Sequence, residues 1–122
     1  MWSNCLFVAL GGGLGAVGRY LLSLIAAPWS FPVMTLLTNF LGAVVIGAVV
    51  QAAGQLPMSK SAVLFLKTGL CGGFTTFSTF SLETVELLEQ GRWAAGGGYI
   101  LASVGLCLAG VLLGRALVWK IL

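Results

Sequence analysis

Residues 71–81 read Cys-Gly-Gly-Phe-Thr-Thr-Phe-Ser-Thr-Phe-Ser, inside a segment that is otherwise apolar enough to span a bilayer. Each of the two adjacent glycines weakens a helix by about 1 kcal/mol relative to alanine. Five hydroxyl side chains follow within seven residues: Thr75, Thr76, Ser78, Thr79 and Ser81. Broken backbone and polar groups persist at membrane depth only where protein or a water-filled cavity satisfies them. The stretch therefore predicts a helix broken at Gly72–Thr76, forming a site for an ion or a small polar solute.

The composition is that of a membrane protein. Of the 122 residues, 59% are hydrophobic and 7% are charged, and the mean hydropathy is +1.07. Soluble domains carry about 25% charged residues, so this chain is too apolar to cover a surface that faces water. The six basic residues are scattered and form no patch for nucleic acid. The three cysteines have no paired spacing, which argues against disulfides and metal ligands.

Four apolar segments are each near the roughly 20 residues that cross a bilayer. They predict a single all-α domain with transmembrane helices at about 4–27, 32–53, 60–89 and 93–119. All four tryptophans fall at the ends of these segments, where interfacial aromatic residues are enriched. Small residues four apart, at Gly11 and Gly15 and again at Gly110 and Gly114, predict close contact between helix backbones.

The charges are nearly balanced between the two sides of the membrane. Four helices put Lys60, Arg115 and Lys120 on one side and Arg19 and Arg92 on the other. This is a weak positive-inside bias, which is compatible with insertion in both orientations and hence with an antiparallel dimer. The remaining basic residue, at position 67, lies about 10 Å into the third segment, close enough to the end to snorkel.

Polar residues share faces on the second and fourth segments, and two aromatic rings share a face on the third. The residues are Thr35, Thr38, Asn39 and Gly42; Tyr99, Ser103 and Cys107; and Phe77 and Phe80. Interhelical hydrogen bonds or ordinary packing would explain each set alone, but the three sets and the helix break together predict a solvated pathway. Ring edges, which carry the positive part of the aromatic quadrupole, favour an anion. Freed backbone carbonyls near the break favour a buried cation instead.

These motifs closely resemble those of the fluoride channel family (Fluc, also called CrcB). The most specific match is Gly-Gly-Phe-Thr-Thr-Phe-Ser-Thr-Phe at 72–80, supported by Gly-Ala-Val-Gly-Arg-Tyr at 15–20 and Thr-Leu-Leu-Thr-Asn-Phe-Leu-Gly at 35–42. The resemblance implies an antiparallel, dual-topology homodimer in a prokaryotic inner membrane. It further implies passive, fluoride-selective export through two pores per dimer, with a structural sodium ion at the dimer centre.

The resemblance also implies roles for individual residues. Asn39 matches the asparagine that donates to fluoride, and Phe77 and Phe80 match phenylalanines whose edges face the ion. The remaining positions of the implied pore are Ser78 and Thr79 between the rings and Tyr99, Ser103 and Cys107 on the fourth helix. Arg19 would attract anions in a vestibule or snorkel at the interface. The backbone carbonyls of Gly72 and Thr75 match the sodium site.

Cys107 departs from relatives that have serine, and a thiol is a weaker donor than a hydroxyl. Two other classes of membrane protein remain as alternatives. A four-helix, dual-topology drug antiporter needs a carboxylate in the membrane core, and the only acidic residues are Glu83, Glu86 and Glu89, which are expected near an interface. A noncatalytic assembly subunit would explain the glycines but not the hydroxyl stripes. The chain has no histidine and no aspartate, which argues against an enzyme.

Overall fold

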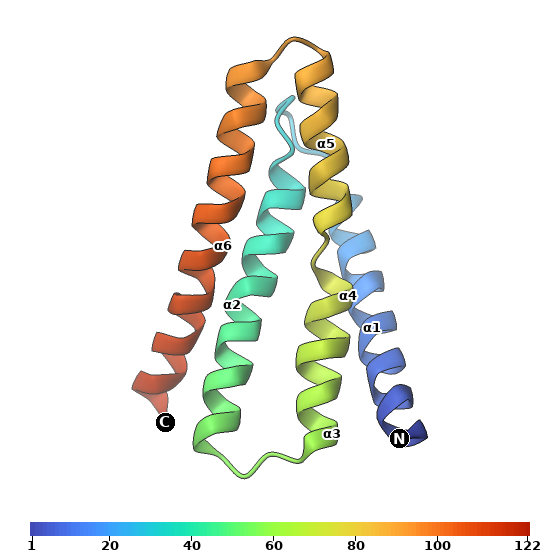
Figure 1. Cartoon of the computed structure of the whole chain (residues 1–122), viewed down its shortest axis with the longest axis vertical. Coiled ribbons are helices and arrows are strands. Elements are labelled where there is room, and N and C mark those ends of the chain that lie inside the picture. The colour runs from blue at the N-terminus through green and yellow to red at the C-terminus, as the bar shows by residue number, and fades with distance from the viewer.

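The computed structural model describes all residues, 1–122, and is helical almost throughout (Figure 1). Its elements are α1 (Trp2–Ser23), α2 (Val33–Gln55), α3 (Lys60–Val63), the π-helix η1 (Leu64–Cys71), α4 (Gly72–Phe74), α5 (Phe77–Glu89) and α6 (Trp93–Ile121). Both termini lie at the same end of the molecule as the α2–α3 connection, and the other two connections lie at the opposite end (Figure 1).

Three of the helices are long and apolar enough to cross a membrane: α1, α2 and α6, with mean hydropathies of 1.6, 2.2 and 2.1. Only 16 of the 122 residues are buried, so most apolar side chains face outward, where a bilayer accepts them. The chain is therefore an all-helical membrane protein.

The first helix is shorter than the sequence predicts. It ends at Ser23 rather than near residue 27, and residues 24–32 form an irregular connection. Pro28 and Pro32 keep this connection from being helical at residues 27 and 31, because proline disfavours helical backbone in the residue before it. The turn between α5 and α6 is tight and uses Gly91 at φ 75°, a left-handed conformation that glycine adopts without penalty.

The break in the third segment is narrower than the predicted Gly72–Thr76. Gly72 and Gly73 are helical, and only Thr75 and Thr76 are extended, with ψ of 155° and 115°. These glycines therefore do not form the break, and Gly73 instead allows close packing against another helix. A Cβ atom on Gly73 would overlap the backbone of Gly12 in α1, so the two segments can approach only because Gly73 has no side chain.

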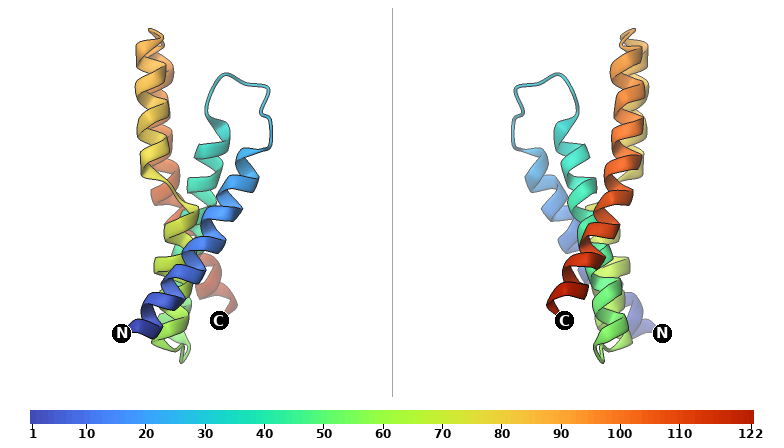
Figure 2. Two further views of the ribbon diagram at one scale, coloured as in Figure 1. Left: turned by 90° about the vertical axis from the view of Figure 1, so that its right-hand side faces the viewer. Right: turned by 90° about the vertical axis from the view of Figure 1, so that its left-hand side faces the viewer.

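The backbone of α1 lies close to those of η1 and α4, and the backbone of α2 lies close to that of α6. A Cβ on Gly15 would meet the carbonyl of Leu70, and one on Gly114 would meet the carbonyl of Val44. The predicted small-residue contacts therefore exist, and they hold the helices together at mid-length. Towards the α5–α6 turn the molecule opens, and that pair of helices diverges from the ends of α1 and α2 (Figure 2).

Candidate functional site

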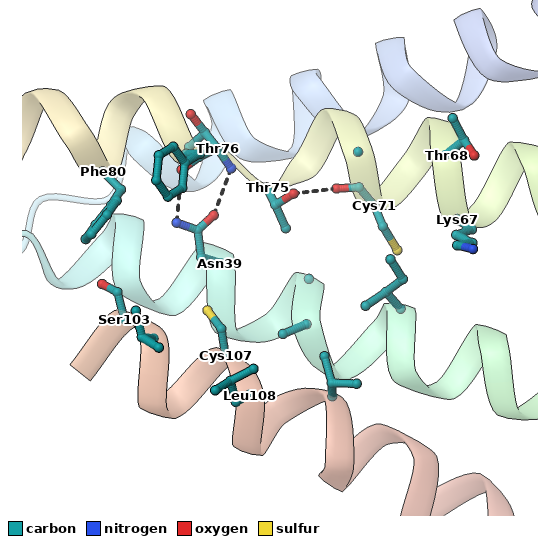
Figure 3. Close-up of a pocket in the computed structure, with 17 residues that line it drawn as sticks. Asn39, Lys67, Thr68, Cys71, Thr75, Thr76, Phe80, Ser103, Cys107 and Leu108 are labelled. Atoms are coloured by element: carbon teal, nitrogen blue, oxygen red, sulfur yellow. Dashed lines mark hydrogen bonds between the residues drawn. The ribbon is translucent and has the colours of Figure 1, made fainter. Parts of the chain in front are cut away.

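A pocket of about 620 Å³ runs along α2, the broken segment and α6 (Figure 3). Seven of the residues predicted for the pore or the cation site line it: Asn39, Gly72, Thr75, Phe77, Phe80, Ser103 and Cys107. They come from chain segments far apart in sequence, so the fold brings the helix break and two of the polar faces to one cavity.

Asn39 holds the break open with both ends of its amide. Its Oδ1 accepts from the Thr76 N–H at 2.8 Å, and its Nδ2 donates to the Thr76 carbonyl at 3.1 Å. In a continuous helix the Thr76 N–H would bond to the carbonyl four residues earlier. An asparagine amide has two N–H donors, so one remains after the bond to Thr76. The side chain can thus position the backbone and still donate into the pocket.

Thr76 also begins the helix that follows the break. Its Oγ1 accepts from the Thr79 N–H at 3.1 Å, which caps the N-terminus of α5. Neither the N–H of Phe77 nor that of Ser78 takes part in any of the hydrogen bonds that join this turn to the rest of the chain. These free donors and the positive end of the helix dipole favour an anion beside the first turn of α5.

Carbonyl oxygens on the other side of the break have the opposite polarity. Arg19 Nε donates to the Gly73 carbonyl at 3.2 Å, and Thr75 Oγ1 donates to the Cys71 carbonyl at 2.9 Å. None of the chain's loop, cap or side-chain hydrogen bonds ends on the carbonyl of Gly72 or Thr75. Two free oxygens of this kind fit a hard cation such as sodium, provided that further oxygens complete the coordination.

Ser103 is the one buried side chain whose polar atom has no partner. It is 7% exposed, its Oγ makes no hydrogen bond, and it lines the pocket near Phe80 (Figure 3). A buried hydroxyl without a partner costs about 1–3 kcal/mol. The chain itself therefore leaves this donor unused.

Comparison with known proteins identifies the family of this chain. A family model described as CrcB-like protein, Camphor Resistance (CrcB), matches residues 6–115. The chain belongs to the CrcB-like family.

Many relatives carry the name fluoride-specific ion channel FluC, and three of them illustrate the similarity. The protein of Roseiflexus sp. (strain RS-1) is 49% identical, over 91% of this chain and 93% of the relative. That of Shewanella frigidimarina (strain NCIMB 400) is 47% identical, over 97% and 98%. That of Ruminiclostridium cellulolyticum is 45% identical, over 93% and 91%. Each match covers more than nine-tenths of this chain and of the relative.

Within this CrcB-like chain, Tyr99 lies behind the pocket rather than in it. Its side chain is fully buried, and its hydroxyl donates to Glu83 Oε1 at 3.3 Å. Its ring packs against Phe80 with centroids 5.1 Å apart, and Phe80 in turn lies 5.4 Å from Phe77. Tyr99 therefore supports the Phe80 ring, and its hydroxyl is occupied by the carboxylate.

Three other predicted residues also lie apart from the main pocket. Ser78 is exposed and is within hydrogen-bonding distance of the Thr76 hydroxyl. Thr79 lines a separate pocket of about 150 Å³ together with Arg19. The Nε of Arg19 donates to the Gly73 carbonyl, just before the break, and its vestibule or snorkelling role stays a prediction.

Two contributors were not among the residues predicted from sequence. Thr76 was noted only as a hydroxyl, although a threonine three residues before another polar side chain is a typical N-cap arrangement. Lys67 lines the main pocket. The sequence indicates this residue as a candidate, because it is the only charged residue between Lys60 and the break.

Proposed function

We propose that this protein is a passive, fluoride-selective channel that exports fluoride from the bacterial cytoplasm and so protects against its toxicity. The chain is a multi-pass membrane protein, and its relatives are bacterial proteins named for fluoride. The observation that carries the proposal is the buried, unpartnered hydroxyl of Ser103, in a pocket shared with the Asn39 amide and the Phe80 ring.

The donors of this pocket suit a small anion. Asn39 offers an N–H, Ser103 an O–H and Phe80 a ring edge, and none of them carries a charge that would hold the ion tightly. A small anion loses much hydration energy on entry, and donors that converge on it replace that water. Cys107 extends the polar lining with a weaker donor.

Passive movement follows from the positions of the carboxylates. Proton-coupled antiport needs a carboxylate that alternates between proton and substrate, and none of the three glutamates lines the main pocket. Glu83 instead accepts the Tyr99 hydroxyl and faces a different cavity. No observation favours the antiporter alternative.

The proposed assembly is an antiparallel, dual-topology homodimer with two pores. The broken segment 60–89, which lies between α2 and α6 in the chain, would cross the membrane as well. Each subunit would then have four membrane crossings. Phe77 is 78% exposed and Gly72 is also exposed in the single subunit, as expected where a second copy completes the site. Lipid covers the remaining apolar surface.

A sodium ion at the dimer centre would have a structural role. The free carbonyls of Gly72 and Thr75, supplied once by each subunit, would hold it. Sodium would offset the negative end of the helical run that ends at Phe74 and tie the two breaks together. Thermal melting of the purified dimer with sodium replaced by potassium tests this role, because a specific site predicts a lower Tm without sodium.

Fluoride efflux from proteoliposomes tests the function. Vesicles loaded with potassium fluoride should lose fluoride rapidly when a potassium ionophore is added, and vesicles loaded with chloride should keep it. Slow fluoride release from correctly assembled dimers would refute the channel, and release coupled to a pH gradient would indicate an antiporter. Cross-linking between cysteines near Phe77 of two copies, together with labelling of one site from both sides of the membrane, tests the antiparallel arrangement.

A further inference from the structure

Lys67 is a cation in the pocket without a partner in the chain. Each of the three arginines donates to a backbone carbonyl or an amide oxygen, whereas Lys67 makes no such bond. Lys60 and Lys120 lie at the ends of their helical segments, where water can solvate them. Lys67 instead lies within η1 and lines the same pocket as Asn39.

No carboxylate of the same subunit can neutralise this charge. All three glutamates are in α5, beyond the break. The nearest in sequence, Glu83, is 16 residues away (83 − 67), or about 24 Å of helix rise. A lone ammonium at this depth is costly unless it faces water or an anion. Lys67 is exposed in the single subunit, so its counter-charge comes from solution, from a bound anion or from a second subunit.

The position of Lys67 connects it with the proposed pore. Lys67, Cys71 and Thr75 recur every four residues and form one column along the pocket. Figure 3 shows Lys67 and Thr68 at one end of the pocket and Phe80 and Ser103 at the other end. Asn39 lies between the two ends. Between Lys67 and Ser103, the polar groups on the wall of the pocket are the Cys71 thiol, the Thr75 hydroxyl and the Asn39 amide, and apolar side chains such as Ile46, Leu108 and Val111 line the rest.

We propose that Lys67, with the neighbouring Thr68 hydroxyl, forms an anion-collecting site that raises the fluoride concentration at the mouth of the pore. This rests on the proposed channel function. A flexible, hydrated ammonium suits the purpose, because it attracts an anion without the bidentate grip of a guanidinium. The site sets the conductance at low fluoride and leaves selectivity to Asn39, Phe80 and Ser103.

The test measures initial fluoride efflux as a function of ionic strength. Lys67→Met keeps the length of the side chain and removes the charge, Lys67→Arg keeps the charge, and Lys60→Met is the matched control outside the pocket. We expect Lys67→Met to lower flux at low fluoride about fivefold, the factor for a unit charge 4 Å away in water. Lys67→Arg should retain most of the flux and Lys60→Met all of it.

Salt dependence separates attraction from a structural role. Wild-type flux should fall as an impermeant salt is raised from about 0.01 M to about 1 M, because the Debye length shrinks from roughly 30 Å to roughly 3 Å. Lys67→Met flux should change much less. Wild-type flux that is independent of salt would overturn the proposal even if the variant failed to fold.

Other outcomes are equally distinguishable. Equal losses in Lys67→Met and Lys67→Arg would assign Lys67 to packing, and dissociation of the dimer in Lys67→Met with salt-independent wild-type flux would assign it to a subunit contact. Undiminished flux in Lys67→Met at low salt would mean that the side chain snorkels to the headgroups. Each result overturns the collecting site. Absence of fluoride flux in the wild type would instead refute the channel itself.

Discussion

Replacement of Asn39 by aspartate tests the centre of the site. The change is isosteric, and it keeps the acceptor for the Thr76 N–H at 2.8 Å. It removes the donor to the Thr76 carbonyl and sets a carboxylate oxygen against that carbonyl, 3.1 Å away in the wild type. A carboxylate about 4 Å from fluoride would repel it by about 4 kcal/mol at an effective dielectric constant of 20, or roughly a thousandfold in occupancy.

Two further variants separate the charge from the hydrogen bonds. Asn39→Ala loses both bonds to Thr76, about 2 kcal/mol in total, but adds no charge, so its flux should fall less than that of Asn39→Asp. Gln51→Glu is the matched control, because it makes the same change near the end of the same helix, where Gln51 contacts Arg115. Its flux should equal that of the wild type.

The assay is initial fluoride efflux from proteoliposomes, with gel filtration and thermal melting to verify assembly. Efflux from Asn39→Asp above about one tenth of the wild-type rate, from an intact dimer, would refute the placement of the Asn39 amide on the ion path. An equal loss in the alanine and aspartate variants would mean that Asn39 acts only by holding the break.

Three other substitutions, with one control, test the surrounding structure. Phe80→Ile keeps bulk but removes the ring edge, so flux should fall on the order of tenfold with the dimer intact; unchanged flux would contradict the edge argument. Gly73→Leu should lower stability by about 1–3 kcal/mol or prevent assembly, because its side chain would overlap the backbone of α1. Gly54→Leu, with nothing within 4 Å, should change thermal melting little, and equal effects of the two would refute the close contact. Tyr99→Phe should cost about 1 kcal/mol from the lost bond to Glu83 and change flux less than twofold, whereas a tenfold loss would place the Tyr99 hydroxyl on the path.

The sequence identified the residues of the site more readily than the side chains with which they form hydrogen bonds. Asn39, Phe80, Ser103 and Cys107 were predicted from their residue types and helical spacing, and the structure brings them to one pocket. The same spacing placed Tyr99 on the fourth-helix stripe, but its hydroxyl is paired with Glu83. Helical periodicity shows which residues share a face. It does not show which neighbouring side chain forms a hydrogen bond with each of them.

The amino-acid sequence by itself determined the membrane setting, because hydrocarbon requires long apolar segments and places tryptophans at their ends. It also determined where helices can touch, since only small residues allow the approach of backbones such as those at Gly15 and Gly114. Tertiary structure alone decided where the helix breaks. The amide of Asn39, 37 residues away, takes the Thr76 N–H, so the extended residues are two threonines and the glycines remain helical. Such a break depends on competition for one hydrogen bond between distant parts of the chain, which local sequence does not encode.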